Sequence, residues 1–214
     1  MPQGPRIYVL AGPNGAGKSS IGGAMLRSAG AEYFNPDEAA ARILTRSPGL
    51  SQEAANSAAW NHGRRLLERA IAERKHLAFE TTLGGNTIPR LLAEAHNAGI
   101  EVRVWFIGLE SPELHVARVR ARVASGGHDI PEASIRERYD RSRMNLIRLM
   151  PRVAELFVYD NSRQADPQRE QAPEPKLILH MVGSRVTECC KLTTAPNWTK
   201  PILAAAMKIS RRQP

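Results

Sequence analysis

The chain has 214 residues, of which 42% are apolar and 24% are charged, and its formal net charge is +9. This is the composition of an ordinary globular protein, and it excludes collagen-like and intrinsically disordered chains. No segment approaches the roughly 18 apolar residues of a membrane span. We therefore expect a cytoplasmic protein without membrane contact, whose basic surface attracts anions such as nucleic acids or phosphorylated small molecules.

Strand and helix patterns alternate along the chain. In chain order they are a strand at 6–12, a helix at 17–29, a weaker strand at 32–37, helices at 38–46 and 51–74, a strand at 76–82, a helix at 87–98, a strand at 101–109, helices at 112–124 and 131–150, strands at 156–162 and 176–182, and a helix at 198–210. This alternation predicts an α/β fold with a mainly parallel sheet flanked by helices. We expect residues 1–214 to form a single domain, with a C-terminal strand and helix at about 176–210.

A phosphate-binding motif follows the first expected strand. The segment GPNGAGKS at residues 12–19 fits the pattern G-x-x-x-x-G-K-[ST], in which glycines turn backbone N–H groups toward phosphate oxygens. Lys18 should reach the β and γ phosphates of a nucleotide, and the Ser19 hydroxyl should help to hold Mg²⁺. The motif predicts a P-loop NTPase fold that binds ATP and Mg²⁺. The expected ATP-binding residues are Gly12, Pro13, Asn14, Gly15, Ala16, Gly17, Lys18, Ser19 and Ser20.

Carboxylates and hydroxyls end two of the other expected strands. Asp37 ends one, and Glu80 and Thr82 lie at the end of another. Ligands of open α/β sheets collect beyond the carboxyl ends of the strands, so these side chains should face the phosphate loop. A carboxylate there can accept the proton of an attacking hydroxyl, which favours a kinase. Two alternatives stay open: Asp37 can cap the helix that follows it, and Glu80 can bind Mg²⁺ through water.

Arginines gather on two helices that a glycine-rich segment joins. Arg118 and Arg122 lie one turn apart on the helix at 112–124. Four more follow the segment SGGHDIP: Arg136, Arg138, Arg141 and Arg143. Planar guanidinium groups suit the charge of transferring phosphoryl oxygens. We therefore expect residues 112–150 to form a helical lid that closes over the phosphates and excludes water.

Five segments together resemble the zeta-toxin family of P-loop kinases: GPNGAGKS, FNPDEAA, FETTLGG, RVASGGHDIPEASIRERYDRSRMNL and FVYDNS. The similarity covers about residues 6–162. It implies an ATP- and Mg²⁺-dependent phosphotransferase, and toxins of this family phosphorylate UDP-N-acetylglucosamine. The resemblance implies that the acceptor is a small molecule, with a nucleotide sugar of this kind as the leading candidate. An antitoxin protein stays open as a partner.

The resemblance also implies roles for individual residues. Asp37 is expected to be the general base, and Glu80 and Thr82 to contact the acceptor. Arg122 and Arg138 are expected to stabilise the transferring phosphate, with Arg118 as a substitute for either. Lys18 completes the expected catalytic set. Two other functions stay open from the residues alone: a kinase for the 5′-hydroxyl of a nucleic acid, and an ATP-binding module that acts through a protein partner without catalysis.

Overall fold

The structure is a computed structural model that describes residues 4–21, 33–127, 129–163 and 174–211. Most of the helix expected at 17–29, residues 164–173, and His128 of the SGGHDIP segment lie outside these residues. Ser20 is described as part of a helix, without its side chain. No helix in the described ranges has the length and apolar character needed to cross a membrane.

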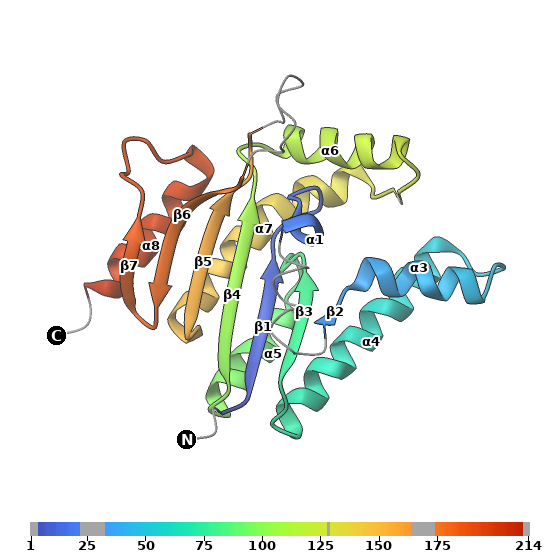
Figure 1. The fold of residues 1–214 in the computed structure, drawn as a ribbon, viewed down its shortest axis with the longest axis horizontal. Coiled ribbons are helices and arrows are strands. Elements are labelled where there is room, and N and C mark those ends of the chain that lie inside the picture. Colours follow the sequence, from blue (N-terminus) through green and yellow to red (C-terminus); the bar gives the residue numbers. More distant parts are fainter. Residues whose placement is uncertain (1–3, 22–32, 128, 164–173, 212–214) are drawn as a thin grey trace.

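Within the described residues, a seven-stranded sheet has the order β2-β3-β1-β4-β5-β6-β7 (Figure 1). Its strands are β1 (Arg6–Ala11), β2 (Tyr33–Phe34), β3 (Leu77–Thr81), β4 (Glu101–Gly108), β5 (Glu155–Asp160), β6 (Lys176–Val182) and β7 (Arg185–Cys189). The first five strands pair in parallel, and β6 and β7 extend the sheet antiparallel to them. The expected α/β fold with a mainly parallel sheet is therefore confirmed.

Strand β7 was not expected from the sequence. It forms a hairpin with β6, and Gly183 in the turn has a positive φ of 55°. Four of its five residues are exposed, so β7 lacks the apolar run that marks the inner strands. The short turn with a glycine between two extended segments is the local signal that predicts such a hairpin.

Helices cover the sheet and stand at its edges. They are α1 (Lys18–Ile21), α3 (Pro36–Arg46), α4 (Gln52–Ala72), α5 (Thr87–Asn97), α6 (Pro112–Ala124), α7 (Glu132–Leu149) and α8 (Lys200–Ser210), with 3₁₀ turns at Met150–Arg152 and Asn197–Thr199. Figure 1 shows α5, α7 and α8 behind the sheet, α3 and α4 beside its β2 edge, and α6 across the end where the parallel strands finish.

The lid expected at 112–150 divides into two parts. The C-terminal half of α7 lies in the main core, where Leu146 and Leu149 are buried. A smaller apolar cluster instead joins α6 to the start of α7: Val116, Val119, Ile130 and Ile135. Of the described residues in this range, α6 and the first turns of α7 therefore stand apart from the main core. They lie over the carboxyl ends of the parallel strands.

Candidate functional site

The phosphate loop lies beside the end of β3. Ala11 and Thr81 are partners in the parallel register of β1 and β3, and the Gly12 N–H donates to the Thr81 carbonyl over 3.2 Å. Gly12 has a φ of 140°, and a Cβ there would lie 2.0 Å from the Ile107 carbonyl oxygen. No other residue fits this position, because both the backbone conformation and the space require glycine. The loop is thus fixed between β3 and β4.

Lys18 forms a buried ion pair at the centre of the site. Its side chain is 6% exposed and its Nζ lies 3.5 Å from Oε1 of Glu80, whose side chain is 7% exposed. The same Nζ donates to the Pro13 carbonyl over 3.2 Å. Each of these two buried charges needs the other for its stabilisation, because an unpaired charge at this position would be poorly solvated. The amine is held inside the phosphate loop, ready for an anion.

Glu80 also collects hydroxyl and amide donors. Its Oε2 accepts hydrogen bonds from Ser19 Oγ at 2.9 Å, Tyr33 Oη at 3.0 Å and Asn35 Nδ2 at 3.3 Å. The Ser19 hydroxyl and the Glu80 carboxylate form a set of oxygen donors on the phosphate side of the site. Mg²⁺ in phosphate sites takes such oxygen ligands, directly or through water. Glu80 could therefore hold Mg²⁺ together with Ser19, and it also lines the cavity described below.

Asp37 lies in the first turn of α3, but it does not cap that helix. Asn35 is the N-cap, and its Oδ1 accepts from the backbone N–H of Asp37 and Glu38 at 2.9 and 3.3 Å. The capping alternative for Asp37 is therefore wrong. Its carboxylate instead lies 3.6 Å from Nη1 of Arg122, with 43% of the Asp37 side chain exposed. This pair joins α3 to the C-terminal part of α6.

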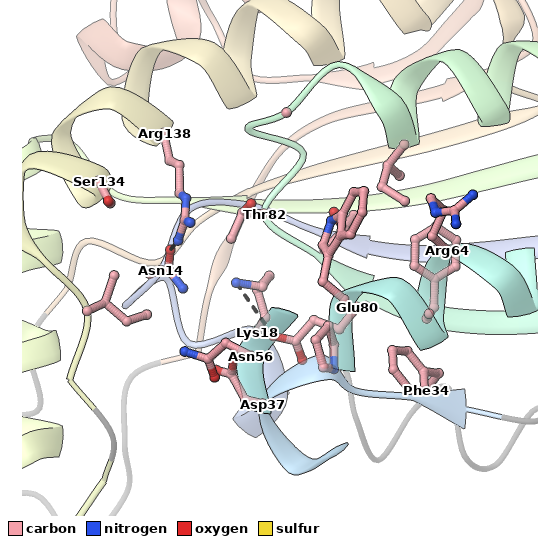
Figure 2. A pocket seen from close by; sticks show the side chains of 18 of the residues that line it. Asn14, Lys18, Phe34, Asp37, Asn56, Arg64, Glu80, Thr82, Ser134 and Arg138 are labelled. Atoms are coloured by element: carbon pink, nitrogen blue, oxygen red, sulfur yellow. Dashed lines mark hydrogen bonds and ion pairs between the residues drawn. The ribbon is translucent and has the colours of Figure 1, made fainter. Parts of the chain in front are cut away.

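One cavity of about 360 Å³ brings most of these groups together. It is lined by Lys18 of the phosphate loop, Asp37 of α3, Glu80 of β3, Thr82 of the following loop and Arg138 of α7. Figure 2 shows Arg138 and Asp37 reaching the cavity from different elements, with Lys18 between them. A cation, carboxylates and hydroxyls thus face one space of the size of a small-molecule site.

The phosphate loop and α7 are directly linked through Asn14. Arg138 Nη1 donates to Oδ1 of Asn14 over 2.8 Å, so the guanidinium lies against the phosphate loop. On the β3 side, the Thr82 hydroxyl accepts from the Gly84 N–H over 3.3 Å. Asn145 of α7 donates to the carbonyls of Leu83 and Gly85 over 2.8 and 2.9 Å. Helix α7 therefore positions both sides of the cavity.

Arg118 faces a different place from Arg122, although both belong to α6. Its Nη2 donates to the carbonyls of Asn161 and Arg163, at 2.7 and 3.0 Å. Burial lowers the pKa of Arg118, and the nearby Asp160 carboxylate opposes this effect. Arg118 is not part of the cavity wall among the described residues. It lies beside the segment that follows β5.

A buried histidine supports the phosphate loop from behind. His115 of α6 is 0% exposed, and its Nδ1 donates to the Asn14 carbonyl over 2.7 Å. Its Nε2 is buried and has no hydrogen-bond partner among the described residues. Desolvation lowers the pKa of His115 to about 4, and the positive charge of Lys18 adds to this effect. The ring is therefore neutral at pH 7.

The buried His115 predicts a loss of stability in mild acid. Between pH 7 and pH 5 the unfolded chain binds a proton on this ring that the folded protein, with a pKa of about 4, does not bind. The free energy of unfolding should therefore fall by about 2 kcal/mol over this range from His115 alone. Denaturant unfolding of the parent protein and of His115→Asn at both pH values measures how much of the fall in the free energy of unfolding is due to His115. The variant should show a shallower fall, and an unchanged fall would contradict the assignment. His96→Asn, on the exposed surface of α5, is the control.

Sequence reasoning missed two residues that shape the site. Asn35 joins Glu80 to the start of α3, and the order Asn35-Pro36 is a helix-start signal that could have identified it as the cap. His115 carries no local signal, because its partner Asn14 is distant in the sequence. Such contacts follow only from the packing of α6 over the phosphate loop.

Comparison with known proteins identifies a family model and a relative that match this chain. The model of a family described as an AAA domain matches residues 7–145. An uncharacterized protein of Haemophilus influenzae is 33% identical over 128 residues, which are 60% of this chain and 88% of that protein.

Solved structures share the same fold at low sequence identity. The AvrRxo1-ORF1:-ORF2 complex with ATP has a TM-score of 0.66 and 15% identity, covering 98% of this chain and 64% of its own, so this chain spans less than two thirds of that protein. The PezAT toxin-antitoxin system of Streptococcus pneumoniae has a TM-score of 0.52 and 17% identity, covering 74% of this chain and 68% of its own. The expected P-loop NTPase fold is thus confirmed.

Proposed function

The chain belongs to the AAA domain family, and on this premise we propose that it is an ATP-dependent kinase that transfers the γ-phosphate to a hydroxyl of a small acceptor. One observation carries the proposal: Lys18, Asp37 and Arg138 line a single cavity although they come from the phosphate loop, α3 and α7. A phosphate-binding cation, a carboxylate and a guanidinium around one space suit phosphoryl transfer to a bound acceptor.

In this proposal each group has a separate task. The acceptor hydroxyl attacks the γ-phosphorus, the new O–P bond forms as the bond to the β–γ bridging oxygen breaks, and ADP leaves. Asp37 takes the hydroxyl proton. Lys18 and Arg138 stabilise the charge on the transferring oxygens. Mg²⁺, held near Ser19 and Glu80, would supply further positive charge when bound with ATP.

Arg122 of α6 is not among the described residues that line the cavity, and we propose that it reaches the cavity when the lid closes. Its Nη1 lies 3.6 Å from the Asp37 carboxylate, so a small shift of α6 changes the distance of this guanidinium from the reacting groups. We propose that residues 1–214 work as one domain and that α6 with the first turns of α7 forms its lid. Closure would exclude water from the phosphate, which a kinase needs to avoid hydrolysis.

More specifically, we propose that the protein is a kinase of the zeta-toxin type. The motifs quoted above support it, and a toxin-antitoxin system is among the proteins with a similar fold. The proposed acceptor class is a nucleotide sugar such as UDP-N-acetylglucosamine, with Glu80 on the metal side and Thr82 near the acceptor. An antitoxin protein is the proposed class of protein partner.

One assay tests this function. The protein is incubated with Mg²⁺, γ-labelled ATP, a panel of nucleotide sugars and an RNA oligonucleotide with a 5′-hydroxyl, and the labelled product is identified by mass. The expected result is a phosphorylated nucleotide sugar or related small molecule. Label on the RNA would establish the nucleic-acid kinase instead. ATP binding with no labelled product would favour a module that acts through a protein partner.

A further inference from the structure

The cavity extends beyond the reacting groups along one face of α4. Asn56, Trp60, Gly63 and Arg64 line it, and their spacing of four, three and one residues places them on one side of the helix. None of them has a task in the transfer proposed above. Figure 2 shows Arg64 and Phe34 on one side of the cavity and Arg138 on the other. The cavity thus has a second end, away from Arg138.

Arg64 supplies a cation at this second end. Its Nη1 donates to Oε1 of Glu68, one turn further along α4, at 2.5 Å, and its side chain is 31% exposed. Glu68 is not among the residues that line the cavity. The Glu68 carboxylate fixes the direction of the Arg64 guanidinium and uses one of its five N–H groups. The planar guanidinium group suits a carboxylate or a phosphate. An arginine held by one carboxylate in this way can use its other N–H groups to bind an anion.

Trp60 supplies a flat apolar surface beside this cation. It lines the cavity and is 45% exposed. The neighbouring wall is close-packed, because a Cβ on Gly63 would lie 2.4 Å from Cε1 of Phe34. The indole face can therefore cover the C–H face of a ring, while the Asn56 amide can bind a hydroxyl at its rim.

We propose that the acceptor is a hydroxylated ring that carries an acidic group, a carboxylate or a phosphate, which binds Arg64 while the ring packs on Trp60. The reacting hydroxyl then lies toward Lys18 and Asp37. The proposal rests on the kinase function proposed above and adds to it a binding place for the acidic group of the acceptor, which a nucleotide sugar also carries. Two separate cationic sites allow one cavity to bind two anions. Lys18 and Arg138 bind the γ-phosphate, and Arg64 binds the acidic group of the acceptor.

Acceptor charge is tested first. The protein and the Lys18→Met variant are each given Mg²⁺, γ-labelled ATP and four sets of acceptors: neutral sugars and polyols, sugar acids, sugar monophosphates, and nucleotide sugars. A small-molecule cell extract is the fifth set, and products are identified by mass. Transfer confined to acidic molecules supports the proposal, and the labelled set shows whether the acid is a carboxylate or a phosphate. Transfer to neutral acceptors overturns it and leaves the kinase function standing. No transfer above Lys18→Met overturns the kinase function and this proposal with it.

Arg64 is then tested with the acidic acceptor that the assay identifies. Arg64→Gln should raise KM for that acceptor by about 10- to 100-fold, since a hydrogen-bonded charge is lost, and should leave kcat and KM for ATP unchanged. Arg64→Lys should give an intermediate KM. Arg65→Gln removes the same charge from an exposed position of the same helix and should change nothing. An unchanged KM in Arg64→Gln, or an equal rise in Arg65→Gln, would overturn the assignment.

Discussion

Replacing Lys18 with methionine is expected to lower the rate of phosphate transfer on the order of 10²- to 10³-fold, the usual effect of removing one group that stabilises transition-state charge. The Nζ of Lys18 donates to the Pro13 carbonyl and the Lys18 side chain is 6% exposed, so the charge is held in a buried position inside the phosphate loop. Single-turnover transfer of the γ-label at saturating ATP and acceptor measures the chemical step. A folded variant that transfers at the parent rate would remove Lys18 from the mechanism.

Stability needs a separate control for this variant. Lys18→Met leaves the Glu80 carboxylate buried without its partner at 3.5 Å, and breaking a buried ion pair costs about 3 to 5 kcal/mol. The double variant Lys18→Met/Glu80→Gln removes both charges and should recover part of the free energy of unfolding. It should not recover transfer. Recovery of transfer together with stability would mean that the single variant lost activity only because it lost its fold.

The sequence predicts those parts of the fold whose signal lies in adjacent residues. The apolar runs in β1 and β3 are nearly continuous because both faces of these strands are largely covered, whereas β4 alternates in its first half, where Glu101 is exposed and Arg103 is half-buried. The phosphate loop is a single segment with a glycine at position 12 that no other residue can replace. Residues that follow parallel strands meet at one edge of the sheet, which is why Asp37 and Glu80 could be placed near Lys18 in advance.

The directions of long side chains could not be predicted in the same way. Arg118 and Arg122 lie one turn apart on α6, yet Arg118 binds carbonyls after β5 while Arg122 lies near Asp37. Each partner is far away in the sequence, so only the packed position of α6 decides between them. The same holds for α4. The sequence shows that Trp60 and Arg64 are spaced to share one face of a helix, but it does not show that this face borders a cavity.

The second large effect is expected at Asp37. The variant Asp37→Asn should lower transfer by about 10²- to 10⁴-fold, the range for loss of a general base, while ATP binding and the free energy of unfolding stay close to the parent values. The fold should tolerate the change, because Asn35 caps α3 and the Asp37 side chain is 43% exposed. The lost ion pair with Arg122 is partly exposed and contributes at most about 1 kcal/mol.

Glu38 offers a matched control for Asp37. It is the next residue in the same first turn of α3, its side chain is 51% exposed, and its ion pair with Arg42 has a distance of 3.9 Å. It does not line the cavity among the described residues. Glu38→Gln removes one negative charge from the same helix end, so it reproduces any general electrostatic effect on ATP or on the helix. Transfer should fall in Asp37→Asn and not in Glu38→Gln, with calorimetric ATP binding alike in both. An equal fall in the two variants would assign the effect to charge at the start of α3, and parent-rate transfer in Asp37→Asn would show that another group takes the proton.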